Sequence, residues 1–113
     1  MNQEVVQDLI EMMGGEFTDL VRVYLEDTPR SVELLERAAA IGDNDGLVAP
    51  SHSLKSTSAN LGALGLSEMA KRIEHGARSH NLSADPVRLV SQLKSEYQRV
   101  EQELNRLLTG VQA

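Results

Sequence analysis

The chain has 113 residues, a formal net charge of −6 and no cysteine, which excludes disulfides, thiolate metal ligands and a thiol nucleophile. With 41% hydrophobic and 25% charged residues, the composition predicts one soluble domain spanning residues 1–113. The longest nearly apolar stretch, residues 59–66, is too short to cross a bilayer, and the acidic amino terminus does not resemble a secretory signal. We therefore expect a cytoplasmic protein with no membrane contact of its own.

The negative charge is concentrated in the first part of the chain. Residues 1–45 contain 11 acidic and 3 basic side chains, whereas residues 46–113 contain 6 acidic and 8 basic ones. Nucleic acid is not an expected partner, because binding to phosphates needs clustered lysine and arginine on a basic protein. The mildly basic second part instead suits an acidic protein surface.

Apolar residues recur at helical spacing from the start of the chain. They predict a first short helix over residues 5–13 and a second over residues 17–25. Thr28 and Pro29 predict the start of a third, because threonine caps backbone N–H groups and proline suits the first helical position. This third helix is expected to end at Gly42.

Three more helices follow in the pattern. The fourth is expected to begin at a cap provided by Asp43 or Asp45 and to run to about Gly65, and Ser67 is expected to cap a fifth. A sixth begins near Pro86 and carries apolar residues at alternating spacings of three and four: Val90, Leu93, Tyr97, Val100, Leu104 and Leu107. No segment alternates with the period of a strand. The prediction is an all-α fold, an antiparallel four-helix bundle with short amino-terminal capping helices.

The fourth helix separates into two faces when its residues are projected at about 100° per residue. Its inner face carries Leu47, Pro50, Leu54, Ser58 and Leu61. The opposite face carries His52, Ser56, Ala59 and Ala63, with Val48 and Lys55 on its flanks. Small side chains beside an outward histidine would let another protein approach closely.

His52 is the candidate functional residue. A lone histidine is most often a structural or inconsequential one, but this one points away from its own bundle. A neutral imidazole is a nucleophile, and the ammonium of Lys55, three residues on, could stabilise a phosphoryl group attached to it. The serines around His52 have no partnering acid, and the pair Glu74-His75 is not a metal-ligand set, so a hydrolase or metalloenzyme has little support.

Residues 52–63, HSLKSTSANLGA, resemble the signature of histidine-containing phosphotransfer (HPt) domains of bacterial multistep phosphorelays. That signature is a histidine, any residue, a hydrophobic residue, lysine, glycine, small residues and a Leu-Gly-Ala type ending. The resemblance covers about residues 5–80 and extends to four further segments: Gly14-Gly15-Glu16, residues 25–29, residues 40–43 and residues 69–78.

The resemblance implies that His52 accepts a phosphoryl group from the aspartate of one response-regulator receiver domain and passes it to the aspartate of another. Lys55 would stabilise the phosphoryl charge, and a docking surface for receivers would include Val48, Ser56, Ala59 and Ala63. The protein would be a carrier without autonomous kinase activity, with no metal or cofactor of its own. Mg²⁺ and most catalytic groups would belong to the receivers, and a hybrid sensor histidine kinase would lie upstream.

Two residues depart from the family pattern. Ser56 stands where glycine is usual, which we expect to retune partner choice rather than abolish function. Pro50 lies just before His52 inside the expected helix, so we predict a local bend or a late helix start there. The alternative function is a non-catalytic helical module that binds receivers without phosphotransfer. We expect a monomer, because the last helix leaves no second apolar stripe for a partner, and the sequence does not distinguish a complete protein from a domain of a hybrid kinase.

Overall fold

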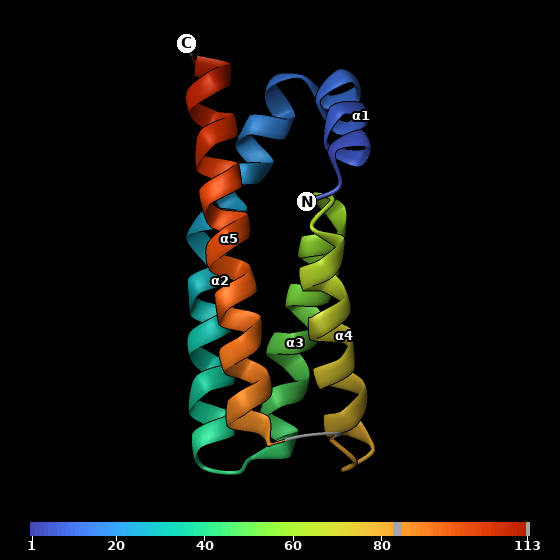
Figure 1. Ribbon diagram of the computed structural model, residues 1–113, viewed down its shortest axis with the longest axis vertical. Helices are drawn as coiled ribbons and strands as arrows, with labels where there is room; N and C mark the ends of the chain where they lie inside the picture. Colours follow the sequence, from blue (N-terminus) through green and yellow to red (C-terminus); the bar gives the residue numbers. More distant parts are fainter. Residues whose placement is uncertain (83–84, 113) are drawn as a thin grey trace.

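The computed structural model describes residues 1–82 and 85–112, and within them it contains five helices and no strand. The molecule is elongated, with extents of 44 × 19 × 18 Å. Four of the helices form an antiparallel bundle: α2 (Gly15–Ala40), α3 (Asn44–Asn60), α4 (Leu64–Arg78) and α5 (Pro86–Gln112). The remaining helix, α1 (Gln3–Met13), lies across one end of the bundle (Figure 1). The predicted all-α antiparallel bundle is confirmed.

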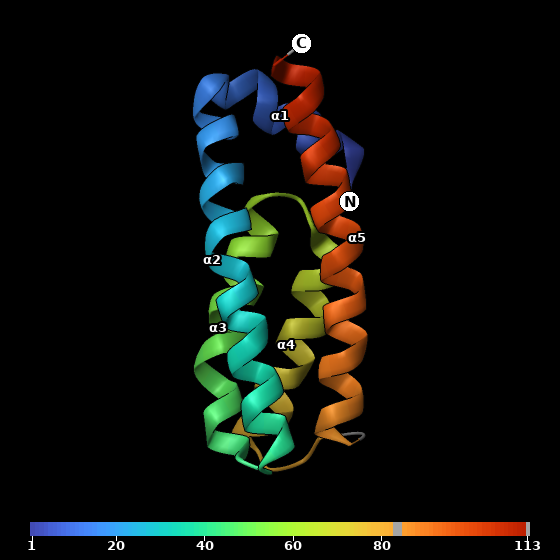
Figure 2. The same ribbon diagram turned by 90° about the vertical axis from the view of Figure 1, so that its left-hand side faces the viewer.

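The four bundle helices differ in length, and α1 lies at the end of the bundle where the two shorter helices stop. α2 and α5 have 26 and 27 residues, whereas α3 and α4 have only 17 and 15. α1 covers the short α3–α4 connection (Figure 2), where the backbone N–H of Asn2 donates to the carbonyl of Gly62 at 3.1 Å. Gly62 has a φ of +82°, and a Cβ there would lie 3.0 Å from Cγ1 of Val5. Glycine at this position therefore permits both the turn and the seating of α1.

The second and third predicted helices are one continuous helix. The expected boundary at Thr28 and Pro29 is wrong, because α2 runs through Pro29 without a break. Apolar residues on either side of the proline, such as Val21 and Val32, are buried along the same stripe of α2. Packing of this uninterrupted stripe outweighs the backbone hydrogen bond that a proline removes inside a helix.

Other helix ends differ from the prediction by a few residues. Asp43 caps α3 as one of the two predicted candidates, its carboxylate accepting from the N–H of Gly46 at 3.0 Å. α3 ends at Asn60 and not near Gly65, and the N-cap residue of α4 is Ala63. Ser67 is therefore not a helix cap. Its hydroxyl donates to the carbonyl of Lys55 at 2.7 Å, a bond that joins α4 to α3 beside the candidate site.

The core lies along the bundle axis and is mostly aliphatic. Leu35, Leu54, Leu66, Leu93 and other large side chains are fully buried there. Within the described residues, no helix is both long and apolar enough to span a membrane.

Candidate functional site

The middle of α3 presents His52 to solvent. The imidazole is 56% exposed, whereas Leu47, Leu54 and Ser58 on the opposite side of the helix are buried. The two-faced character predicted for this helix is confirmed on these residues. His52 is thus carried by a regular helix whose other face is fixed in the core, not by a loop.

Pro50 lies within α3, one turn after the helix begins. The predicted late helix start is wrong, because α3 begins at Asn44. Proline cannot donate to the carbonyl of Gly46 four residues earlier. The next residue, Ser51, is buried, and its hydroxyl donates to the carbonyls of Leu47 and Val48 at 2.6 and 3.1 Å. Despite the proline, α3 continues through His52 to Asn60.

A buried carboxylate from the neighbouring helix lies beneath His52. The side chain of Glu74 on α4 is only 4% exposed. Its Oε2 lies 2.8 Å from Nδ1 of His52, and its Oε1 accepts a hydrogen bond from Nζ of Lys55 at 2.7 Å. Arg78, one turn further along α4, donates to Oε2 from Nε and Nη2 at 3.2 and 2.9 Å. One carboxylate thus joins three side chains from two helices.

The hydrogen bonds decide the ionisation of Glu74. Burial alone raises the pKa of this carboxyl, but hydrogen bonds from Lys55, Arg78 and His52, together with the charge of Lys55, lower it from 4.5 to about 2. Glu74 is therefore a carboxylate near neutral pH and only accepts hydrogen bonds. Nδ1 of His52 must then carry the proton of the His52–Glu74 bond, which leaves Nε2 as the nitrogen with the lone pair in a neutral imidazole.

The structure brings together some of the predicted site residues and separates one. Lys55 lies beside His52 through the shared carboxylate. Ser56 and Ala59 are exposed and Val48 is half-buried, and their predicted role in docking stays a prediction. Ala63 is only 1% exposed, so its predicted place on the exposed face is wrong. The physical reason is that α3 ends before Ala63, which is buried as the N-cap residue of α4.

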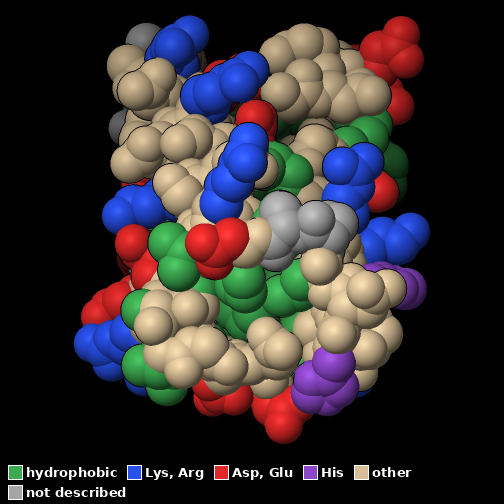
Figure 3. Space-filling model, turned by 60° about the horizontal axis from the view of Figure 1, so that its bottom comes forward, with side chains coloured by type: hydrophobic (Ala, Val, Ile, Leu, Met, Phe, Trp, Pro, Cys, Tyr) green, Lys and Arg blue, Asp and Glu red, His purple; other side chains and the backbone are tan. Residues whose placement is uncertain are grey.

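Glu74 and Arg78 were missed as functional residues from the sequence. The pair Glu74-His75 gave no metal-ligand pattern, yet its glutamate is the residue that contacts His52. A signal was present, because Glu74 follows Ile73 within a buried stripe where an unpaired acid would be costly. His75 and His80 are exposed and lie outside this cluster. Figure 3 shows histidine side chains on the α4 side of the lower end of the bundle.

The arrangement can perform nucleophilic chemistry at one atom. Nδ1 of His52 is held by Glu74, so the ring is oriented and its tautomer is set. Lys55 and Arg78 supply two positive charges against the one negative charge of the carboxylate. The site therefore favours an anionic group attached to the imidazole.

Comparisons with known proteins agree with this geometry. The family model described as Hpt domain matches residues 19–107. The crystal structure of histidine-containing phosphotransfer protein B (HptB) from Pseudomonas aeruginosa PAO1 is similar, with a TM-score of 0.87 and 28% sequence identity over 96% of this chain and 94% of that one. A search of curated proteins found no significant match. Because the family model covers most of the sequence, the chain belongs to the Hpt domain family, whose members carry phosphoryl groups on histidine in phosphorelays.

Proposed function

We propose that this protein accepts a phosphoryl group on Nε2 of His52 from the phosphorylated aspartate of one receiver domain and passes it to the aspartate of another. The observation that carries the proposal is the bond between Nδ1 of His52 and Glu74 at 2.8 Å. It leaves the outer nitrogen as the nucleophile on an exposed helical face. Because the ring is supported from below, the receiver need only bring its phosphoryl group to within reach.

The transfer balances without an added base. The lone pair of Nε2 forms the N–P bond while the P–O bond to the donor aspartate breaks, and the aspartate leaves as a carboxylate. The ring keeps the proton on Nδ1 and gains positive charge, which Glu74 stabilises. Transfer to the second receiver reverses these changes, since an aspartate oxygen attacks phosphorus and Nε2 regains its lone pair.

Lys55 is proposed to stabilise the phosphoryl oxygens. Its side chain is 29% exposed, and its ammonium is bound to Glu74 in this structure. A flexible lysine can exchange one anionic partner for another, and Arg78 and His52 would still hold the carboxylate when Lys55 leaves it. Mg²⁺ and the acidic pocket that binds it are proposed to come from the receivers, with no autonomous kinase activity in this chain.

The test is phosphotransfer from receiver domains loaded with acetyl phosphate. We expect radiolabel to pass from at least one receiver of a panel to the wild-type protein and to be labile in acid but stable in base. His52→Gln should remove the label, whereas the matched variant His75→Gln should keep it. Labelling that survives in His52→Gln would refute the assignment, and receiver binding with no transferable label would instead establish a non-catalytic binding module.

A further inference from the structure

The carboxylate of Glu74 contacts the one nitrogen of His52 that can still titrate after phosphorylation. In the phosphorylated ring, Nε2 is bonded to phosphorus, so only Nδ1 can gain or lose a proton. Nδ1 is the atom that lies 2.8 Å from Oε2 of Glu74. The position of Glu74 therefore bears on how the phosphorylated ring reacts, and not only on how the free ring is oriented.

The proton on Nδ1 decides which group leaves when the N–P bond breaks. Water or a receiver aspartate attacks phosphorus, and the electron pair of the N–P bond returns to Nε2. If Nδ1 carries a proton, the leaving group is a neutral imidazole. If Nδ1 has lost its proton, the leaving group is an imidazolate anion, a much stronger base that leaves far more slowly. The phosphorylated protein is thus reactive while the ring is protonated and long-lived once the ring is not.

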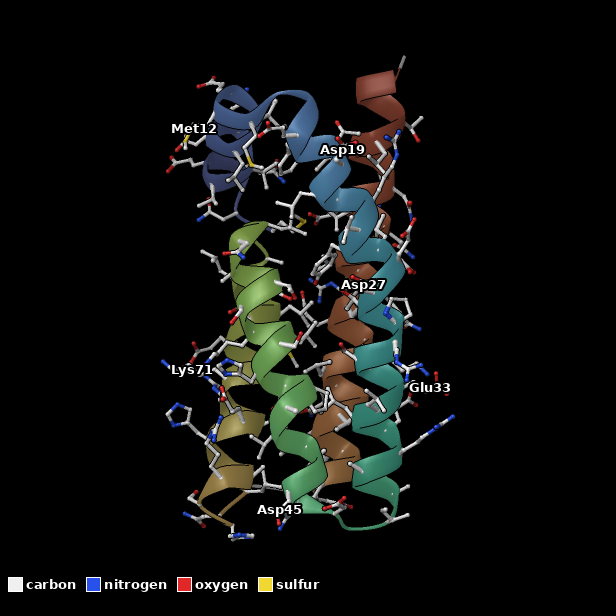
Figure 4. All side chains as sticks on the ribbon, turned by 180° about the vertical axis from the view of Figure 1, so that it is seen from behind. Met12, Asp19, Asp27, Glu33, Asp45 and Lys71 are labelled. Carbon is white, nitrogen blue, oxygen red and sulfur yellow. The ribbon has the colours of Figure 1, made fainter. Side chains whose placement is uncertain are left out.

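The charged groups around the ring come from α3 and α4. Lys55 on α3 bonds to Oε1 of Glu74, and Arg78 on α4 bonds to Oε2. Figure 4 shows Lys71, also of α4, on this side of α3. These cations oppose a positive charge on the ring, whereas Glu74 favours it through a direct hydrogen bond. α2 packs against the other side of α3, where its Asp27 lines a groove whose lining does not include the ring.

The direct bond to Glu74 outweighs the neighbouring cations. The side chain of Glu74 is only 4% exposed, so water and salt screen its attraction to the ring weakly. In the proposed reaction Lys55 moves to the phosphoryl group, whose own negative charge adds to that of Glu74 in favouring a protonated ring. Because the pKa of Glu74 is about 2, its carboxylate stays charged throughout the neutral and alkaline range.

We propose that Glu74 keeps the phosphorylated ring of His52 protonated on Nδ1 through the neutral and mildly alkaline range, and so determines the pH above which the carrier retains its phosphoryl group. The inference rests on the proposed function. Glu74 is a positioning residue in this role, because it contacts the ring at Nδ1 and not at the reacting nitrogen. An imidazole without such a partner is mostly deprotonated at pH 7.5, since its ordinary pKa is about 6.5. With Glu74, a neutral imidazole is still the leaving group there.

The test follows the loss of label from the phosphorylated protein alone. The protein is loaded with labelled phosphoramidate, which needs no receiver, and release of inorganic phosphate is measured over a series of pH values from acid to alkaline. The rate should fall in wild type at a pH about one to two units higher than in Glu74→Gln, the shift that corresponds to one hydrogen bond to a charged group. Glu68→Gln, which removes an exposed carboxylate of the same helix, should keep the wild-type profile. Coincident profiles of wild type and Glu74→Gln would overturn the inference.

Arg78→Met gives a prediction of the opposite sign, on a side chain that is 59% exposed. Without Arg78, the ring is the remaining donor to Oε2 of Glu74, so the fall in rate should move about 0.2 to 0.7 pH units above that of wild type. An unchanged or lower pH would overturn the inference, and this variant decides alone if circular dichroism shows that Glu74→Gln does not fold. Label that persists in His52→Gln would instead refute the proposed function.

Discussion

The substitution Glu74→Gln removes the charge of the buried carboxylate while keeping its shape. Glutamine retains one acceptor oxygen and replaces the other with an NH₂ group. That group must face either Lys55 or the pair formed by His52 and Arg78. An NH₂ group cannot accept a hydrogen bond from these donors, so at least one bond of the cluster is lost. We expect lower stability near neutral pH and a weaker hold on the imidazole.

The size of the effect follows from the pKa of Glu74, which falls from 4.5 to about 2 in the folded protein. Each pKa unit corresponds to about 1.36 kcal/mol, so the ionised carboxylate contributes about 3 kcal/mol to the free energy of unfolding at pH 7. Since the folded pKa is the lower one, this stability is complete above the unfolded pKa and is lost as the pH falls through the folded pKa. At pH 3, about 2 kcal/mol of it is already lost.

Urea unfolding followed by circular dichroism at pH 7 and pH 3 measures this contribution. All other carboxyl groups are shared by the two proteins, so the difference between wild type and Glu74→Gln isolates Glu74. We expect the stability difference to narrow by about 2 kcal/mol between pH 7 and pH 3. A difference of the same size at both pH values would refute the argument that Glu74 is ionised by its partners, and with it the assignment of the proton to Nδ1 of His52.

Three further substitutions test the packing that supports the site. Pro29→Ala restores a backbone N–H donor inside α2 and should raise the free energy of unfolding by about 1 to 2 kcal/mol, measured as a higher Tm. An unchanged Tm would mean that the proline does not destabilise this helix. Gly62→Ala should lower stability by about 1 to 2 kcal/mol because of its φ of +82°, while the control Gly65→Ala, with no atom within 4 Å of the added Cβ, should not. Tyr24→Phe leaves the buried hydroxyl of Ser58 without its partner and should lower the free energy of unfolding in urea by about 1 to 2 kcal/mol. Adding Ser58→Ala should recover part of that loss. A double variant whose stability loss equals the sum of the two single losses would contradict the hydrogen bond.

Helical periodicity was sufficient to predict the fold, but a local rule misplaced one boundary. The Thr28-Pro29 pair has the chemistry of a helix start, yet the buried stripe from Val21 through Tyr24 to Val32 keeps its spacing across the pair. Continuity of that stripe was the better signal, because buried apolar area along a long helix outweighs one missing hydrogen bond. The same reliance on local pattern extended α3 past its true end and placed Ala63 on the wrong face.

The histidine could be predicted from the sequence and its carboxylate partner could not. The faces of one helix follow from residue spacing alone, so the outward position of His52 could be predicted from the sequence. The contact between His52 and Glu74 depends on how α3 and α4 are aligned along their length. That alignment is fixed by the short α3–α4 connection and by the bond from Ser67 to the carbonyl of Lys55. The spacing of apolar residues in the sequence predicts neither of these features.

The sharing of Glu74 among three donors has a consequence for how quickly the proposed carrier could act. A site in which one lysine alone neutralised the buried carboxylate would have to leave that charge bare each time the lysine turned to an incoming phosphoryl group. Here Arg78 and His52 bind Oε2, and Lys55 binds Oε1. Lys55 can therefore leave Oε1 to bind the phosphoryl group and bind Oε1 again after transfer. The proposed exchange therefore needs a change in the Lys55 side chain and no movement of the α3 backbone.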